Sequence, residues 1–264
     1  MTAPGLRTDI SDGILRITID RPARLNALDE ATCTALTDAF ESPATDAAED
    51  IRVIVLTGSG GSFSAGADVI DIASNSPSSE AEAQQAAEHT MRRANALIRA
   101  IIFCPVPVVA QVNGPAVGIG ASMALASDLI YASEDAYFLL AFTKIGLMPD
   151  GASSLLVPAA VGRARASAMM LLADQMSAED ALATGLINGV VPTAELTARV
   201  DTAVRRLARA PRRALELTKR ALTASTLSLL DDALERESEG QIELLTSPEF
   251  TERVMAIASP SKGA

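Results

Sequence analysis

The chain has 264 residues, of which 48% are hydrophobic, and a formal net charge of −11; this length suits one large domain with a substantial core. The acidic balance argues against a nucleic-acid partner, because phosphate neutralisation needs clustered Lys and Arg. No apolar run is long enough to span a membrane, and the first ten residues lack a signal-peptide pattern. Cys33 and Cys104 show neither metal-ligand spacing nor a disulfide framework. We therefore expect a cytoplasmic protein with no membrane association and no bound metal.

The first part of the chain predicts alternating strands and helices. A helix is expected to begin at Asp29, a candidate N-cap, because side-chain oxygens of Asp accept from the first free N–H groups of a helix. The predicted elements, in chain order, are a strand over 14–20, a helix over 29–40, a strand over 51–57, a polar loop over 74–79, a helix over 80–103, a strand over 106–112, a helix from 118 and a strand over 128–132. This order predicts an α/β fold with a mostly parallel sheet and right-handed crossovers.

From about Gly151 the sequence predicts helices almost to its end. They are expected over 153–160, 163–172, 177–184, 195–209, 211–223, 229–245 and 248–258. We predict an α/β core over residues 1–190, which holds the binding site, and a C-terminal helical region over residues 191–264. Basic residues recur at helical spacing in that region: Arg205, Arg206, Arg209, Arg212, Arg213, Lys219 and Arg220. They indicate either a solvated helix face or a site for the phosphates of an anionic ligand.

Two turns of small residues, 58–69 and 113–120, each follow a β-branched apolar run. Glycine-rich turns between a strand and a helix are common, so either turn alone is weak evidence. Placed side by side, however, they could direct two backbone N–H groups at one oxygen atom. Such a pair of donors is an oxyanion hole, which stabilises an enolate or a tetrahedral oxyanion.

These two turns, together with other ordered segments, resemble the crotonase (enoyl-CoA hydratase/isomerase) superfamily. The matching segments are 19–28, 58–69, 113–120, 126–132, 144–153 and 181–188, so the resemblance covers nearly the whole chain. It implies a spiral of small β-sheets and C-terminal helices that assemble trimers, often paired into hexamers. It also implies a coenzyme A thioester as the substrate and no permanently bound cofactor.

The resemblance assigns the oxyanion donors to the backbone N–H groups of Ala67 and Ile119. A helix begins at Ile119, where free N–H groups and the helix dipole both favour negative charge. The coenzyme A segment is expected along Arg24, Leu25, Ala27, Ala65, Asp68 and Val69. Asp68 has an alternative role in ordering its own turn. A phosphate contact from Lys262 is a further expectation.

The family's hydratases use two glutamates, and the motifs place Ser122 and Phe142 at those positions. Neither side chain is a general acid or base at neutral pH. Asp150 instead matches the acidic residue that moves the proton in the family's Δ3,Δ2-enoyl-CoA isomerases. Its apolar neighbours should raise its pKa towards neutrality by desolvation. The alternative is that Asp150 only caps a helix that begins near Gly151.

The sequence thus favours an isomerase, with two rival functions. Phe142, Ser122, Met148 and Leu140 are expected to line the acyl pocket. One rival is a hydratase or lyase that uses another carboxylate, such as Asp71 or Glu134; the other is a non-catalytic acyl-CoA-binding scaffold. A serine hydrolase is disfavoured because the one histidine, His89, lies in a polar helical run. The acyl group and the choice between trimer and hexamer are left open.

Overall fold

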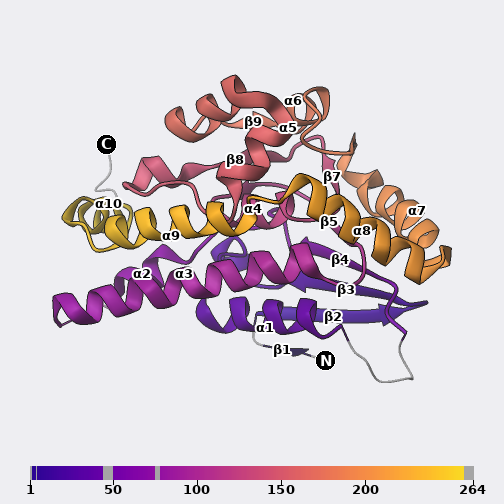
Figure 1. The fold of residues 1–264 in the computed structure, drawn as a ribbon, viewed down its shortest axis with the longest axis horizontal. Coiled ribbons are helices and arrows are strands. Elements are labelled where there is room, and N and C mark those ends of the chain that lie inside the picture. The colour runs from indigo at the N-terminus through magenta and orange to yellow at the C-terminus, as the bar shows by residue number, and fades with distance from the viewer. Residues whose placement is uncertain (1, 4, 44–49, 75–77, 259–264) are drawn as a thin grey trace.

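A seven-stranded and a three-stranded β-sheet form the centre of the fold (Figure 1). The computed structural model describes residues 2–3, 5–43, 50–74 and 78–258. The larger sheet contains, in spatial order, β1 (Thr2–Ala3), β2 (Leu6–Ser11), β3 (Ile14–Ile19), β4 (Val53–Gly58), β5 (Val108–Val112), β7 (Leu129–Ser133) and β10 (Gly189–Val191). The smaller sheet contains β6 (Ala116–Val117), β8 (Tyr137–Leu139) and β9 (Met176–Ser177).

Parallel pairing dominates the larger sheet, as the order of the elements predicts. The pairs from β3 through β4, β5 and β7 to β10 are parallel, while β1–β2 and β2–β3 are antiparallel. In the β4–β5 pair, Leu56 lies opposite Ala110 and Thr57 opposite Gln111. Because parallel strands end at the same edge, the two glycine-rich turns that follow β4 and β5 emerge side by side.

Helices cover the two sheets and extend to the end of the described chain (Figure 1). They are α1 (Glu30–Glu41), α2 (Val69–Ser74), α3 (Glu80–Phe103), α4 (Ile119–Leu125), α5 (Ser153–Ser167), the π-helical continuation of α5 (Ala168–Leu172), α6 (Ala178–Ala183), α7 (Leu196–Arg209), α8 (Arg212–Thr226), α9 (Leu230–Leu245) and α10 (Pro248–Ala258). Short 3₁₀ turns occupy Pro22–Arg24, Ala141–Ile145 and Thr193–Glu195. The polar loop predicted over 74–79 lies partly outside the described residues.

Side-chain caps fix the ends of several helices. Asp29 accepts a hydrogen bond from the backbone N–H of Thr32 at 2.8 Å, which confirms it as the N-cap of α1. Ser177 accepts from Asp180 N at 3.1 Å at the start of α6. The N-cap of α5, Ala152, instead has a left-handed φ of 62° and offers no side-chain cap. The first N–H groups of α5 therefore need an acceptor from elsewhere.

The last helices pack back onto the α/β core. Helix α9 lies along α3 (Figure 1), where the side-chain amide of Asn95 donates to the hydroxyl of Ser238 at 2.8 Å. Helix α10 packs against α2, and α7 covers β4, β5 and β7 with Val200 and Val204, both fully buried. The C-terminal helices therefore reach both the sheet and the edge where the two turns emerge.

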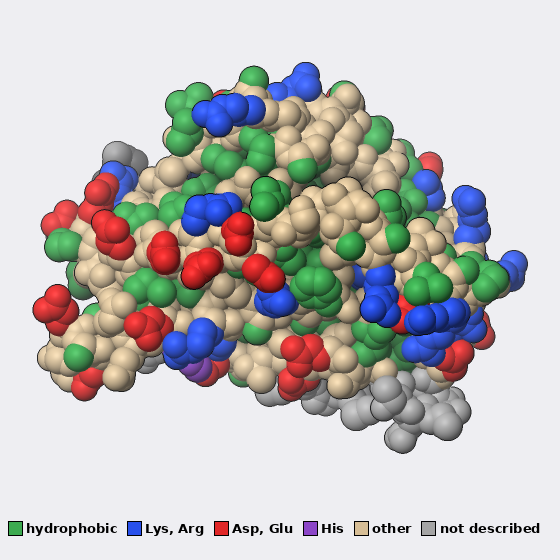
Figure 2. Space-filling model, viewed as in Figure 1, with side chains coloured by type: hydrophobic (Ala, Val, Ile, Leu, Met, Phe, Trp, Pro, Cys, Tyr) green, Lys and Arg blue, Asp and Glu red, His purple; other side chains and the backbone are tan. Residues whose placement is uncertain are grey.

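The basic residues of α7 and α8 are largely neutralised by nearby carboxylates. Figure 2 shows basic side chains gathered where α7 and α8 lie, and acidic ones in a row over α9. Arg213 and Arg220 both pair with Glu216, at 2.6 Å and 3.7 Å. Lys219 departs from the solvated-face interpretation: it is buried, and its ammonium group contacts Asp128 at 2.7 Å. Burial of this kind is tolerated because the charge is paired.

One described helical stretch, Ser153–Leu172, is long and apolar enough to cross a membrane by length and composition. The expectation from sequence was that no such run exists. The stretch is two helices rather than one, because Gly162 interrupts it with a φ of 77° and a ψ of 161°. Arg163 and Arg165 follow the interruption. Two short helices, the second of which begins with charged residues, are typical of a protein surface rather than a membrane span.

Candidate active site

The turns after β4 and β5 are hydrogen-bonded to each other. Val117 N donates to Ser64 O at 2.9 Å, and Phe63 N donates to Pro115 O at 3.0 Å. A second link ties the first turn to the segment before α1, where Leu28 N donates to Gly66 O at 2.7 Å. These backbone bonds hold the two turns as one rigid unit.

Each predicted oxyanion donor directly follows a glycine with positive φ. Gly66 has a φ of 89° and precedes Ala67, while Gly118 has a φ of 54° and precedes Ile119. A Cβ atom on Gly66 would lie 2.7 Å from the carbonyl oxygen of Val117 and 3.5 Å from Ile119 N. Glycine therefore lets the turns approach this closely. The amides of Ala67 and Ile119 donate to no other described residue, and both residues line one pocket.

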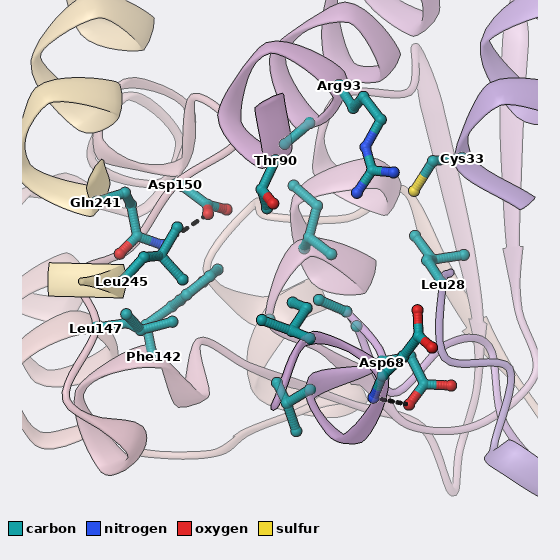
Figure 3. A pocket seen from close by; sticks show the side chains of 18 of the residues that line it. Leu28, Cys33, Asp68, Thr90, Arg93, Phe142, Leu147, Asp150, Gln241 and Leu245 are labelled. Atoms are coloured by element: carbon teal, nitrogen blue, oxygen red, sulfur yellow. Dashed lines mark hydrogen bonds between the residues drawn. The ribbon is translucent and has the colours of Figure 1, made fainter. Parts of the chain in front are cut away.

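The pocket runs from these turns to α9 and α10 and has two different ends. In Figure 3, Asp150 and Gln241 lie on one side with Phe142, while Asp68 and Arg93 lie on the opposite side. Its apolar lining includes Leu28, Val69, Ile72, Met91, Ala94, Leu97, Val117, Ile119, Phe142, Ile145, Leu147, Leu245 and Phe250. Such an apolar cleft with a few convergent polar groups is typical of a small-molecule site.

Asp150 is the carboxyl group at the apolar end. Its residue is 7% exposed, and its Oδ2 accepts a hydrogen bond from Nε2 of Gln241 at 2.8 Å. Its other oxygen, Oδ1, is buried and has no hydrogen-bond partner among the described residues. Burial raises the pKa of Asp150 to about 7; the bond from Gln241 opposes this rise and the charge of Glu237 adds to it. A carboxyl group with this pKa can both take and return a proton near neutrality.

The alternative role of Asp150 as a helix cap is wrong. Helix α5 begins at Ser153, and the Asp150 side chain makes no hydrogen bond to the first turn of this helix. The first N–H groups of α5 are bound instead by Glu237 of α9. Its carboxylate accepts hydrogen bonds from the backbone N–H groups of Ala152 at 2.7 Å and Ser154 at 2.9 Å. Glu237 is fully buried, and burial raises its pKa. The Asp150 carboxyl group is thereby left available for chemistry.

Glu237 and Gln241 were not predicted from the sequence, which indicated only a helix there. A signal is nevertheless present: the buried face of α9 consists of Leu230, Ala233, Leu234, Glu237 and Gln241. Two polar side chains on an otherwise apolar helical stripe are unusual, because burial of a polar group without a partner is costly. The pocket also takes Leu245 and Phe250 from the C-terminal helices, in addition to residues of the predicted core.

The structure brings part of the predicted coenzyme A contacts to the pocket. Ala65, Asp68 and Val69 line it, whereas Arg24, Leu25 and Ala27 lie outside its lining, with Leu25 at 60% exposure. Asp68 has the predicted alternative role as well: it accepts from Asp71 N at 3.4 Å and pairs with Arg21 at 3.3 Å. Lys262 lies outside the described residues.

The predicted acyl-pocket residues divide in the same way. Phe142 lines the pocket, while Ser122, Leu140 and Met148 do not. Ser122 is fully buried and its hydroxyl donates to the backbone carbonyl of Asp150 at 3.0 Å, so it supports the loop. Of the two other candidate carboxylates, Asp71 lines the pocket, and Glu134 lines a shallow surface hollow elsewhere.

His89 lies on the surface, as its sequence context predicts. Its side chain is 51% exposed and its Nε2 lies 3.1 Å from Glu30. The histidine is absent from the pocket lining. The groups in the described pocket that could take part in catalysis are therefore carboxyl groups and backbone amides, and its described lining contains no histidine.

Known proteins resemble this chain over nearly its whole length. The enoyl-CoA hydratase/isomerase family model matches residues 9–257. A probable enoyl-CoA hydratase of Rhodobacter capsulatus is 39% identical over 95% of this chain and 93% of its own length. The 1,2-epoxyphenylacetyl-CoA isomerase of Escherichia coli is 34% identical, over 94% and 92%. The crystal structure of an enoyl-CoA hydratase from Mycobacterium avium subsp. paratuberculosis superposes with a TM-score of 0.86 at 44% identity, covering 97% of this chain and 96% of that one. The chain therefore belongs to the enoyl-CoA hydratase/isomerase family and has the crotonase fold.

Proposed function

We propose that this enzyme converts a 3-enoyl-CoA into the 2-enoyl-CoA, with Asp150 as the proton shuttle. The observation that carries the proposal is the free Oδ1 of Asp150 in the same pocket as two free backbone amides. An isomerase needs one base that can hold a proton and one site that stabilises an enolate. Ser122 and Phe142, at the positions of the hydratase glutamates, supply no second acid or base.

The proposed reaction has two proton transfers and no redox change. Oδ1 of the Asp150 carboxylate takes a proton from C2, and the electron pair left behind forms a dienolate whose oxygen is negative. The N–H groups of Ala67 and Ile119 donate to that oxygen, an interaction typically worth about 3 kcal/mol for each donor. The protonated Asp150 then returns the proton to C4, and the double bond settles between C2 and C3.

The substrate is proposed to enter with its coenzyme A segment along Arg24, Leu25, Ala27, Ala65, Asp68 and Val69. Ala65, Asp68 and Val69 support this placement because they lie at the pocket, beside the proposed donor Ala67. The exposed Leu25 would lie under the part of the substrate that remains outside. The acyl group would then extend towards Phe142 and the C-terminal helices. No permanently bound cofactor is required for this reaction.

The relatives support two kinds of reaction. The Escherichia coli relative is a 1,2-epoxyphenylacetyl-CoA isomerase, which supports isomerisation of an acyl-CoA here. The Rhodobacter capsulatus relative is a probable hydratase, and Asp71 lines the pocket as a second carboxylate. Hydration by Asp71 and Asp150 is therefore the second candidate function.

We further propose that the enzyme is a cytoplasmic homotrimer, or a pair of trimers. The residues that favour a subunit contact are Leu171 and Leu172, which are 73% and 70% exposed at the end of the helical stretch after α5. Adjacent, well-exposed leucines are typical of a surface that another chain covers.

The test is to incubate the purified protein in deuterated water with a 3-enoyl-CoA and, separately, with a 2-enoyl-CoA, and to analyse both by mass spectrometry and NMR. The proposal expects double-bond migration with deuterium at C2 or C4 and no gain of water. Addition of water to the 2-enoyl substrate would instead establish the hydratase. Binding of both substrates without any change would contradict the proposed isomerisation and favour the non-catalytic scaffold.

A further inference from the structure

The side chain of Gln241 bridges a backbone amide and the proposed proton shuttle. Its Oε1 accepts from Met148 N at 3.1 Å, and its Nε2 donates to Oδ2 of Asp150 at 2.8 Å. A backbone N–H can only donate, so Met148 determines which end of the Gln241 amide faces it. The other end, a donor, must then face Asp150.

This arrangement distinguishes the two oxygens of Asp150. Because Nε2 of Gln241 is only a donor, Oδ2 must remain an acceptor when the carboxyl group is protonated. The proton is then carried by Oδ1, the oxygen with no partner among the described residues. We propose that Gln241 is a positioning residue that fixes Oδ2 of Asp150 and thereby selects Oδ1 as the oxygen that takes and returns the proton. This inference rests on the proposed function of Asp150.

Glu237, one helical turn before Gln241, holds the same loop from the other side of Asp150. It accepts the N–H groups of Ala152 and Ser154, whereas Gln241 accepts that of Met148. The loop is thus held by one face of α9 both before and after the carboxyl group. Glu237 also acts through its charge, which raises the pKa of Asp150, while the bond from Gln241 lowers it.

No described positive charge contributes to the pKa shift of Asp150; Arg236, next to Glu237 on α9, lowers the pKa of Glu237 itself. Helix α4 presents Ser122, whose hydroxyl binds the loop carbonyl. The other ionisable pocket-lining residues are Asp29, Glu30, Cys33, Asp68, Asp71 and Arg93. Of these, Cys33, Asp68 and Arg93 lie across the cavity from Asp150 (Figure 3), and Glu30 is paired with Arg93. Gln241 and Glu237 are therefore the two side chains expected to control this carboxyl group, with opposite effects.

The first test replaces Gln241 with Met, which has similar length and no hydrogen-bonding amide. We expect kcat for 3-enoyl-CoA isomerisation to fall by about 10- to 100-fold, because a misplaced proton carrier loses orientation. KM should stay within about threefold. The acidic limb of the pH–rate profile should move to higher pH, since the bond that lowers the pKa is gone. Q241E has the same size and an oxygen in place of Nε2, so it should also move the acidic limb to higher pH. This variant replaces Q241M in the test if Q241M does not fold.

The second test uses Glu237→Gln, with Glu239→Gln on the exposed side of the same helix as the matched control. Removal of the Glu237 charge should move the acidic limb to lower pH, opposite to Q241M. E239Q should leave the acidic limb in place, because Glu239 is exposed and has no hydrogen bond or ion pair with a described residue of the loop. Folding of every variant is checked by circular dichroism and thermal unfolding.

Asp150→Asn distinguishes a failure of the proposed function from a failure of the proposed role of Gln241. If D150N keeps wild-type turnover, the proposed function fails. If D150N is inactive while Q241M retains the wild-type kcat and pH limb, the proposed function stands and the role of Gln241 is overturned. Loss of kcat in Q241M with an unmoved limb also overturns it, since that result indicates only structural support. Opposite limb shifts in Q241M and E237Q support the inference.

Discussion

At the scale of single residues, the two buried carboxyl groups beside the 148–154 loop, Asp150 and Glu237, make different contacts. Glu237 makes two hydrogen bonds to backbone N–H groups, whereas Asp150 makes one, from Gln241. The unequal number of partners leaves one oxygen of Asp150 free. An acid in this state is poorly solvated, so it ionises less readily than a carboxyl group in water.

Isomerisation should therefore depend on pH through the ionisation of Asp150. The base must be deprotonated in the free enzyme to take a proton from C2, and its pKa is raised to about 7. We expect kcat/KM to fall about tenfold for each pH unit below about 7, and to level off above it. Steady-state rates with a 3-enoyl-CoA between pH 5 and 9 measure this; a flat profile across that range would exclude Asp150 as the base.

The same carboxyl group should lower stability at alkaline pH. Its pKa is about 7 in the folded chain, against an ordinary value of 3.8. Between these values the folded state binds the extra proton, so stability falls as pH rises from about 4 through about 7. Asp150→Asn removes the ionisation. We expect its free energy of unfolding to exceed that of the wild type by about 1–3 kcal/mol at pH 8 and to match it near pH 4. Urea unfolding at both pH values measures the difference, and equal stability at pH 8 would contradict it.

At the scale of elements, the proposed oxyanion donors depend on backbone geometry rather than on side chains. Gly118 combines a φ of 54° with a ψ of −130°, a conformation that residues with a Cβ atom rarely adopt. The amide of Ile119 is oriented by this residue. The turn is held in place by its hydrogen bonds to the neighbouring turn, such as Val117 N to Ser64 O.

Gly118→Ala should impair catalysis through the backbone alone. A Cβ atom there would meet only Phe142 Cζ, at 3.9 Å, so there is space but the conformation is strained. We expect kcat to fall at least tenfold as the Ile119 amide turns away, with binding of acyl-CoA retained. Gly162→Ala is the matched control, because its φ of 77° is also positive and no atom lies within 4 Å of the added Cβ. G162A should lose stability and keep kcat; equal kcat values in both variants would contradict the prediction.

At the scale of the whole molecule, the sheet brings the turns together and the last helices close the pocket. Residues far apart in the sequence, such as Ala67, Ile119, Asp150 and Gln241, line one cavity. Leu171 and Leu172 are exposed at the end of the helical stretch after α5, and we propose that a neighbouring chain covers them.

Replacing Leu171 and Leu172 with Glu should dissociate the proposed oligomer. Charged side chains in an apolar contact would have to be desolvated without partners. We expect the wild type to have the mass of three or six chains in light scattering after gel filtration, and the double variant to have a lower mass. Leu25→Glu, another exposed leucine, should keep the wild-type mass. A wild-type monomer, or an unchanged mass in the double variant, would contradict the proposed contact.

The sequence predicted the sheet and the pair of turns because their signals are local. β-branched runs followed by small residues mark strand ends, and parallel strands bring their ends to one edge. Whether the Asp150 side chain caps α5 could not be decided from the local sequence. That decision required knowing that Glu237, 87 residues further on, occupies the capping position (237 − 150 = 87). Long-range contacts of this kind depend on packing, which local periodicity does not encode.

The hydrogen bonds from α9 to the loop that carries Asp150 also have a consequence for biosynthesis. Once about 150 residues have left the ribosome, the growing chain contains β1 to β8 and both turns, and folding starts from the N-terminal side as synthesis proceeds. Gln241 and Glu237 emerge almost 100 residues later. A nascent chain would therefore contain the proposed oxyanion donors before Gln241 and Glu237 can bind the loop that carries Asp150. We expect full activity only when translation is nearly complete.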